Sequence, residues 1–174
     1  MSGRAALLIT GTVGAGKTST ADAVGDLLAD AGIPHAVLDL DWLRRSWPCP
    51  PGDPFNSAMT LRNLRDVARN FLDGGAARLV LAGVIESRDE RRLHEEAVGV
   101  ELAVCRLRVA PAALHRRLVR RHDGDDAGLR WHLERSGELD RVLDAARVAD
   151  TVVDAGDRDP AEVAAAVLAA AGWR

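Results

Sequence analysis

The sequence predicts an α/β fold, a five-stranded parallel sheet with helices on both faces and a small lid. Short apolar runs typical of buried parallel strands alternate with longer segments of helical periodicity along all 174 residues. The first run leads directly into a glycine-rich loop and a helix. We expect strands near 5–10, 35–39, 78–85, 100–109 and 149–154. We expect helices near 17–31, 57–73, 87–97, 111–122, 128–147 and 160–171.

Glycine and proline mark the ends of several of these elements. Gly32-Ile33-Pro34 stops the first helix, and Pro111 and Pro160 suit the first turns of the helices that follow them. No internal repeat and no long linker divides the chain. We therefore expect a single domain over residues 1–174, with the lid at about 117–130.

Charge, apolar runs and cysteine placement indicate which partners and which cellular compartment to expect for this protein. The net charge is −3, which gives no reason to expect nucleic acid or an acidic membrane as partner. The first predicted strand leaves no room for a signal peptide, and no apolar run reaches the length of a membrane span. Cys49 falls in a proline-flanked loop and Cys105 in an apolar strand, so neither a disulfide nor zinc is expected. These features predict a cytoplasmic protein, either a monomer or a homodimer.

The glycine-rich loop carries the strongest functional signal. It reads Gly11-Thr12-Val13-Gly14-Ala15-Gly16-Lys17-Thr18 and matches G-x-x-x-x-G-K-[ST] between a strand and a helix. This is the phosphate-binding loop of a P-loop NTPase, and backbone N–H groups of such a loop point at phosphate oxygens. The predicted nucleotide-binding residues are Gly11, Thr12, Val13, Gly14, Ala15, Gly16, Lys17, Thr18 and Ser19.

Lys17 is the only lysine in the chain, and the other 22 basic residues are arginine. A compact ammonium can reach between the β- and γ-phosphates where a guanidinium cannot. Thr18 would offer its hydroxyl to Mg²⁺. ATP and Mg²⁺ are therefore the expected cofactors. A GTPase is excluded, because N-K-x-D would require a second lysine.

Two carboxylates stand where the second strand ends. Asp39 and Asp41 lie two residues apart and face the same side if the chain stays extended. In one interpretation Asp39 takes a proton from an attacking hydroxyl or orders Mg²⁺, with Asp41 beside it. In the other, Asp39 only ends the strand and Asp41 caps the short helix that follows.

The segment Leu38-Asp39-Leu40-Asp41-Trp42-Leu43-Arg44 resembles the L-D-x-D-x-[LV]-R element of adenylylsulfate kinase. Residues 67–75 and 79–85 resemble the third helix and strand of that enzyme. The C-terminal part, 151–164, is similar to the last strand and helix of chloramphenicol phosphotransferase and gluconate kinase. Together these similarities cover most of the chain at the level of the small P-loop kinase superfamily. They imply transfer of the γ-phosphoryl group of ATP to a small molecule.

The sequence departs from adenylylsulfate kinase at two places. An arginine and an asparagine that hold the substrate in that enzyme are replaced by Ser57 and Thr60, and Glu86-Ser87-Arg88 replaces a serine-proline step. The resemblance therefore leaves the acceptor open, and a hydroxyl of a metabolite or an antibiotic fits best. It implies an acceptor site near Asp39, Asp41 and Arg44, with Glu86 either in that site or at the metal, or else paired with Arg88 or Arg91.

Six arginines fall between residues 106 and 121 without an acid among them. The resemblance implies that Arg117 and Arg121, one helical turn apart, lie on a closing lid and stabilise the transferring phosphoryl group. A solvated helix face and a nucleic-acid patch are the alternatives. The resemblance also places Arg158 in a loop that contacts adenine, where the alternative is a solvated turn.

We thus expect an ATP-dependent phosphotransferase that acts on a small-molecule acceptor. The alternative is a nucleotide-binding ATPase or switch module that acts on a protein partner. The proline-rich segment 46–56, which holds Trp47 and Phe55, is expected to line the acceptor pocket or to pack beneath the lid. Trp131 lies in a helical pattern and is expected to belong to the core.

Overall fold

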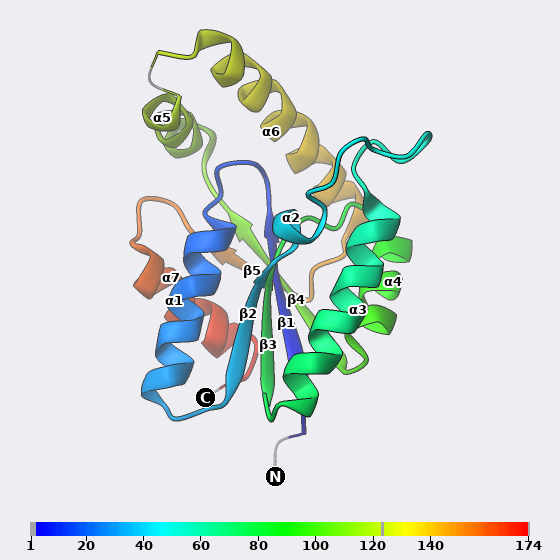
Figure 1. Cartoon of the computed structure of the whole chain (residues 1–174). Helices are drawn as coiled ribbons and strands as arrows, with labels where there is room; N and C mark the ends of the chain where they lie inside the picture. Colours follow the sequence, from blue (N-terminus) through cyan, green and yellow to red (C-terminus); the bar gives the residue numbers. More distant parts are fainter. Residues whose placement is uncertain (1–2, 123, 174) are drawn as a thin grey trace.

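The computed structural model describes residues 3–122 and 124–173, and its centre is a parallel sheet with the strand order β2-β3-β1-β4-β5 (Figure 1). The strands are β1 (Ala5–Gly11), β2 (His35–Asp39), β3 (Arg78–Ala82), β4 (Glu101–Arg108) and β5 (Thr151–Asp154). The helices are α1 (Lys17–Asp30), α2 (Leu40–Leu43), α3 (Ser57–Asp73), α4 (Arg88–Val98), α5 (Pro111–Arg121), α6 (Asp126–Ala146) and α7 (Pro160–Ala170). The predicted α/β fold is confirmed.

Alternation along β1 explains why the sheet is covered on both faces. Leu7 and Ile9 pack into a core that β1 shares with α1, α5 and α7. Ala6 and Leu8 pack into a second core, formed with α3 and α4 on the opposite face. Side chains of a strand alternate between faces, so a fully apolar β1 supplies both cores. Figure 1 shows α1 and α7 on one side of the sheet and α3 and α4 on the other.

Helices α5 and α6 lie across the edge where the strands end (Figure 1). They form the hairpin in which the lid was expected, although residue 123 of the predicted span 117–130 lies outside the described residues. The third strand ends at Ala82, three residues before the predicted end. Gly83, the next residue, lies against Leu40 of α2, where a Cβ would come within 2.5 Å of Leu40 Cδ1.

Helix α6 is held to the sheet by a buried arginine on β4. The side chain of Arg106 is only 5% exposed, and its guanidinium donates to Asp140 at 2.6 Å and to Asp144 at 2.7 Å. The same nitrogen that donates to the Asp140 carboxylate, Nη2, also donates to the backbone carbonyl oxygen of Asp140 at 3.2 Å. A buried guanidinium without these partners would be costly, so the ion pairs fix where the C-terminal half of α6 must lie.

In the part of the chain that the structure describes, no helix combines the length and the apolar character needed to cross a membrane.

We expect the double substitution Asp140→Ala and Asp144→Ala to lower the free energy of unfolding by about 3 kcal/mol, because it leaves the Arg106 guanidinium buried without a carboxylate. Urea denaturation monitored by circular dichroism measures the loss. The matched control is Glu96→Ala, which breaks an exposed pair with Arg92 and should cost no more than about 0.5 kcal/mol. Equal losses in the two proteins would show that the buried pairs do not anchor α6.

Candidate active site

The phosphate-binding loop follows β1 and wraps around the lysine side chain. Gly14 and Gly16 have φ angles of 78° and 93°, a left-handed conformation that glycine adopts without strain. Lys17 Nζ donates to the carbonyl oxygens of Gly11 at 3.1 Å and Thr12 at 2.9 Å. The ammonium is therefore held inside the loop by neutral acceptors, which phosphate oxygens can replace.

The pKa of the Lys17 ammonium is lower than that of an exposed lysine. Burial lowers the pKa of Lys17 to about 8, with Arg121 as a smaller contribution in the same direction. The carboxylates of Asp41 and Asp39 act in the opposite direction. A bound polyphosphate would favour the charged form and raise this pKa again.

Thr18, in the first turn of α1, and Asp39, the last residue of β2, meet although β1, which leads into α1 through the phosphate loop, is not a neighbour of β2 in the sheet. Thr18 Oγ1 donates to Asp39 Oδ2 at 2.8 Å, and Asp39 Oδ1 accepts from the backbone N–H of Asp41 at 2.9 Å. Asp39 is thus the N-cap of α2, and the alternative that Asp41 caps this helix is wrong. One hydroxyl and one carboxylate oxygen suit Mg²⁺, which keeps several waters and takes its other ligands from phosphates.

Three adjoining pockets run along the carboxyl edge of the sheet. The phosphate pocket, of about 560 Å³, contains Lys17, Thr18, Asp39 and Arg121. It shares Gly14, Gly16, Ser19 and Arg117 with a second pocket of about 330 Å³. This second pocket also contains Arg120, Ala155 and Arg158, and we call it the base pocket. It shares Val13, Asp41, Val84 and Trp131 with a third pocket of about 290 Å³, which we call the acceptor pocket.

The two predicted lid arginines are held differently. The guanidinium of Arg117 donates to the carbonyl oxygens of Ala15 at 3.2 Å and Ala155 at 2.7 Å, and also to that of Gly156. Arg117 therefore ties α5 to the phosphate loop and to the loop after β5. Within the described residues the guanidinium of Arg121 has no hydrogen-bond or ion-pair partner, and it lines the phosphate pocket. The two side chains do not act as one pair in this conformation.

The loop after β5 borders the base pocket, and the adenine contact of Arg158 stays a prediction. The Arg158 guanidinium donates to the carbonyl oxygens of Asp154 at 3.1 Å and Glu162 at 3.0 Å, and the residue lines the base pocket. Arg116 pairs with Asp157 of the same loop at 2.9 Å. Arg120 also lines the base pocket, whereas Arg121 lines the phosphate pocket.

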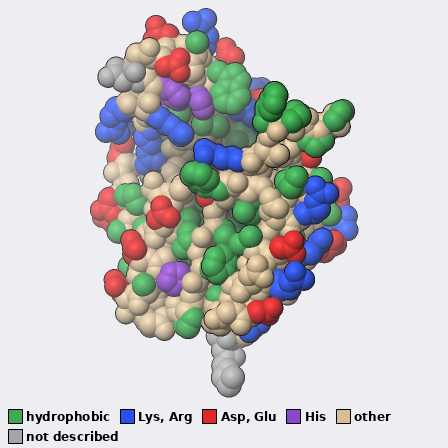
Figure 2. Space-filling view, viewed as in Figure 1, with side chains coloured by type: hydrophobic (Ala, Val, Ile, Leu, Met, Phe, Trp, Pro, Cys, Tyr) green, Lys and Arg blue, Asp and Glu red, His purple; other side chains and the backbone are tan. Residues whose placement is uncertain are grey.

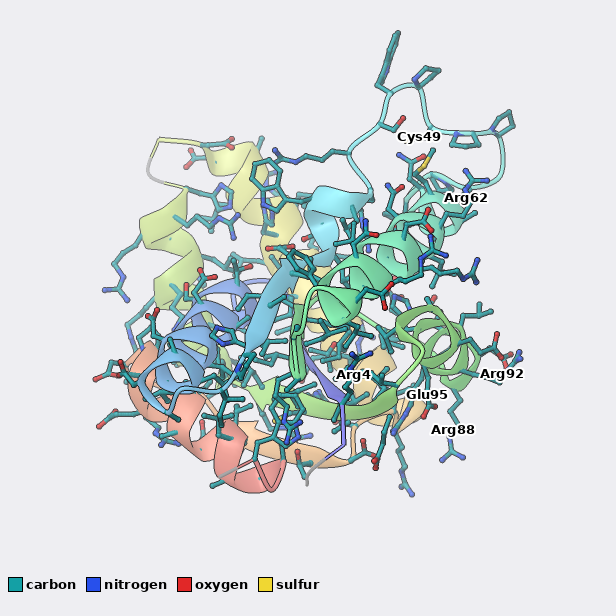
Figure 3. The ribbon with its side chains drawn as sticks, turned by 60° about the horizontal axis from the view of Figure 1, so that its bottom comes forward. Arg4, Cys49, Arg62, Arg88, Arg92 and Glu95 are labelled. Carbon is teal, nitrogen blue, oxygen red and sulfur yellow. The ribbon has the colours of Figure 1, made fainter. Side chains whose placement is uncertain are left out.

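Glu86 lies in the acceptor pocket, and the alternative that it pairs with Arg88 or Arg91 is wrong. It accepts from Arg135 of α6 at 2.6 Å, while Arg91 binds Asp150 at 2.8 Å. Arg88 is exposed and points outward from α4 (Figure 3). Arg135 was not recognised from the sequence, because its partner lies 49 positions away along the chain.

Of the predicted acceptor residues, Asp41, Arg44 and Glu86 line the acceptor pocket together with Ser57 and Thr60, whereas Asp39 lines the phosphate pocket instead. Trp131, expected in the core, is 58% exposed instead and lines both the acceptor and the phosphate pockets. Residues 131, 135 and 139 all line the acceptor pocket, and their spacing of four on one helix was the signal that could have revealed this face.

Phe55 of the proline-rich segment lines the acceptor pocket, whereas Trp47 does not and is 92% exposed. Cys49 belongs to the same segment, which stands away from the body of the molecule (Figure 3). Of the residues 46–56, Phe55 is thus the one that lines this pocket.

Comparison with known proteins identifies the family to which the chain belongs. The family model of adenylylsulphate kinase matches residues 4–120. The Mycobacterium tuberculosis APS kinase CysC, solved in complex with AMPPNP and APS, is 26% identical with a TM-score of 0.63, and the match covers 98% of each chain. No curated protein matches the chain.

Two further solved structures share the fold at lower identity. A tunicamycin resistance protein from Deinococcus radiodurans is 20% identical with a TM-score of 0.71, and the match covers 98% of this chain and 97% of the other. A gluconokinase from Sinorhizobium meliloti is 18% identical with a TM-score of 0.64, and the match covers 98% and 92%.

The fold and the phosphate loop thus define a small P-loop kinase that uses ATP and acts on a small molecule. Within that class, the chain belongs to the adenylylsulphate kinase family.

We expect nucleotide binding to take up protons above pH 7.5, because the pKa of Lys17 is about 8 in the free protein and rises against phosphate. About half a proton should be taken up at pH 8 and nearly one at pH 9, and affinity should fall as pH rises through this range. Titration calorimetry with AMPPNP in buffers of different ionisation enthalpy measures the uptake. Lys17→Met should abolish it, and uptake that persists in this variant would assign the proton to another group.

Proposed function

We propose that this protein transfers the γ-phosphoryl group of ATP to a hydroxyl of a small molecule. The observation that carries the proposal is the order of the three pockets. The phosphate pocket adjoins the base pocket on one side and the acceptor pocket on the other, so a nucleotide in the first two would direct its terminal phosphate toward the third. Such alignment of donor and acceptor supplies much of the rate enhancement in phosphoryl transfer.

Lys17 and the loop N–H groups would hold the β- and γ-phosphates, with Thr18 and Asp39 beside them. Bound Mg²⁺ would neutralise charge on the phosphates, and the Thr18 hydroxyl and the Asp39 carboxylate are the groups that would hold it directly or through water. Asp39 lines the phosphate pocket and accepts a hydrogen bond from the backbone N–H of Asp41, which lines both that pocket and the acceptor pocket. The carboxylate of Asp39 could then act as a general base and accept the proton of the attacking hydroxyl.

Arg121 is the residue that would stabilise charge on the transferring group, because it faces the phosphate pocket without a partner among the described residues. Arg117 would act as a positioning residue, since it joins α5 to the phosphate loop and to the base-pocket loop. This division replaces the expectation that both arginines contact the phosphoryl group.

The proposal is tested by measuring ADP release with and without candidate acceptors. A kinase whose pocket must be filled by an acceptor should hydrolyse ATP only slowly on its own. Lys17→Ala should reduce acceptor-dependent turnover by roughly 10²–10³-fold, because it removes a preorganised charge. Rapid hydrolysis that no acceptor accelerates would favour the ATPase or switch module instead.

We expect Asp39→Asn to reduce kcat by at least about 10²-fold while changing AMPPNP affinity little, because the amide keeps the helix cap but cannot accept a proton. Steady-state kinetics and calorimetric binding separate the two effects. Asp22→Asn, an exposed acid on α1, is the matched control and should behave as wild type. A variant that loses only thermal stability would return Asp39 to a purely structural role.

We expect Arg121→Ala to lower kcat by about 10²-fold, because its charge would be needed only as the phosphoryl group transfers. Arg117→Ala should mainly weaken nucleotide binding. Arg130→Ala, an exposed arginine on α6 that lines none of the three pockets, is the control. Steady-state kinetics over a range of ATP concentrations distinguishes these effects, and a larger kcat loss in Arg117→Ala than in Arg121→Ala would reverse the assignment.

A further inference from the structure

The walls of the acceptor pocket are largely apolar. Three of its apolar side chains remain open to solvent at the mouth, with Phe55 60%, Trp131 58% and Leu93 39% exposed. Figure 2 shows hydrophobic side chains gathered at this end of the molecule, with basic side chains beside them. The complete apolar lining is Val13, Phe55, Leu61, Val84, Leu93, Trp131 and Leu139. Aromatic groups left exposed around a concave site favour an apolar ligand.

Both arginines of this pocket form ion pairs with acidic side chains, although that of Arg44 is not a hydrogen bond. Arg135 binds Glu86 at 2.6 Å and Glu138 at 2.9 Å. Arg44 lies 3.4 Å from Asp41, and its Nε is buried without a hydrogen-bond partner. An anionic acceptor would have to compete with these carboxylates for the guanidinium groups.

The remaining charge of the pocket is negative. Asp41, Glu86 and Glu90 oppose only the two arginines among the lining residues. Glu90 accepts from the backbone N–H of Glu86 at 2.7 Å and has no cationic partner in the described part of the chain. Burial lowers the pKa of His94, so this lining imidazole is neutral near pH 7 and does not restore the balance.

We propose that the acceptor is a hydroxyl compound with an apolar skeleton and no phosphate, sulfate or carboxylate group. It is either uncharged or carries an amine that Glu90 can match. The apolar walls bind the skeleton, and the carboxylates exclude anions by repulsion and by leaving their charge unpaired. The inference rests on the proposed function for the identity of the pocket, but the chemistry of the pocket can be tested without turnover.

The first test measures binding alone, with Nile red as an uncharged apolar probe and 1-anilinonaphthalene-8-sulfonate as an anionic apolar probe. Nile red should bind at least tenfold more tightly than the sulfonate. Trp131→Ala should weaken Nile red binding several-fold, whereas the control Trp47→Ala, which removes an exposed indole outside the pocket, should not. Glu90→Gln, which removes one negative charge, should strengthen binding of the sulfonate at least twofold.

The second test measures ADP release with chloramphenicol and sphinganine as the uncharged and amine-bearing alcohols, and with adenylylsulfate, gluconate and shikimate as anions. The inference predicts that turnover, where it occurs, is confined to the first group. It is overturned if an anion is turned over more efficiently, or if the sulfonate probe binds as tightly as Nile red. Absence of turnover with every compound, together with the predicted probe binding, would count against the proposed function and leave the pocket chemistry supported.

Discussion

The central position of β1 in an all-parallel sheet is the constraint on which the site depends. Its two neighbours, β3 and β4, fix its register, and its apolar side chains supply both cores. The loop that leaves β1 must therefore emerge at the middle of the carboxyl edge, between the two layers of helices. Ligands of open parallel sheets bind at this edge, because the loops of several strands converge there. Asp39, at the end of β2, can reach Thr18 because β1 and β2 end at the same edge of the sheet, and Thr18 follows β1 by way of the phosphate loop.

Helix α6 connects the parts of the site that the strands do not reach. The Arg106 ion pairs hold its C-terminal half against β4, and the Thr12 hydroxyl of the phosphate loop donates to the Ser136 carbonyl at 2.8 Å. The neighbouring residue, Arg135, binds Glu86 in the acceptor pocket. A single helix thus contacts both the phosphate loop and the acceptor pocket. The phosphate pocket and the acceptor pocket therefore share a wall, an arrangement that would suit phosphoryl transfer between two bound molecules.

The sequence predicted elements well where local chemistry was strong. The glycine pattern with its lysine identified the phosphate loop, and the periodicities located the strands and longer helices to within a few residues, apart from the early end of β3. Prediction failed where a side chain's environment came from distant segments. The exposed Trp131 and the partner of Glu86 depend on how α6 crosses the sheet edge, and nothing in the local pattern around these residues specifies that crossing.

The sequence by itself determined that this chain binds phosphate, because G-x-x-x-x-G-K-[ST] between a strand and a helix specifies a local structure whose N–H groups and single lysine face an anion. Only the tertiary structure decided that Arg117 and Arg121 have different surroundings. Arg117 donates to carbonyl groups 38 and 102 positions away along the chain, whereas Arg121 lines the phosphate pocket. The tertiary structure also decided the charge of the acceptor pocket. That charge follows from carboxylates and guanidinium groups brought together from separate helices and loops, and pairing across such distances is set by packing.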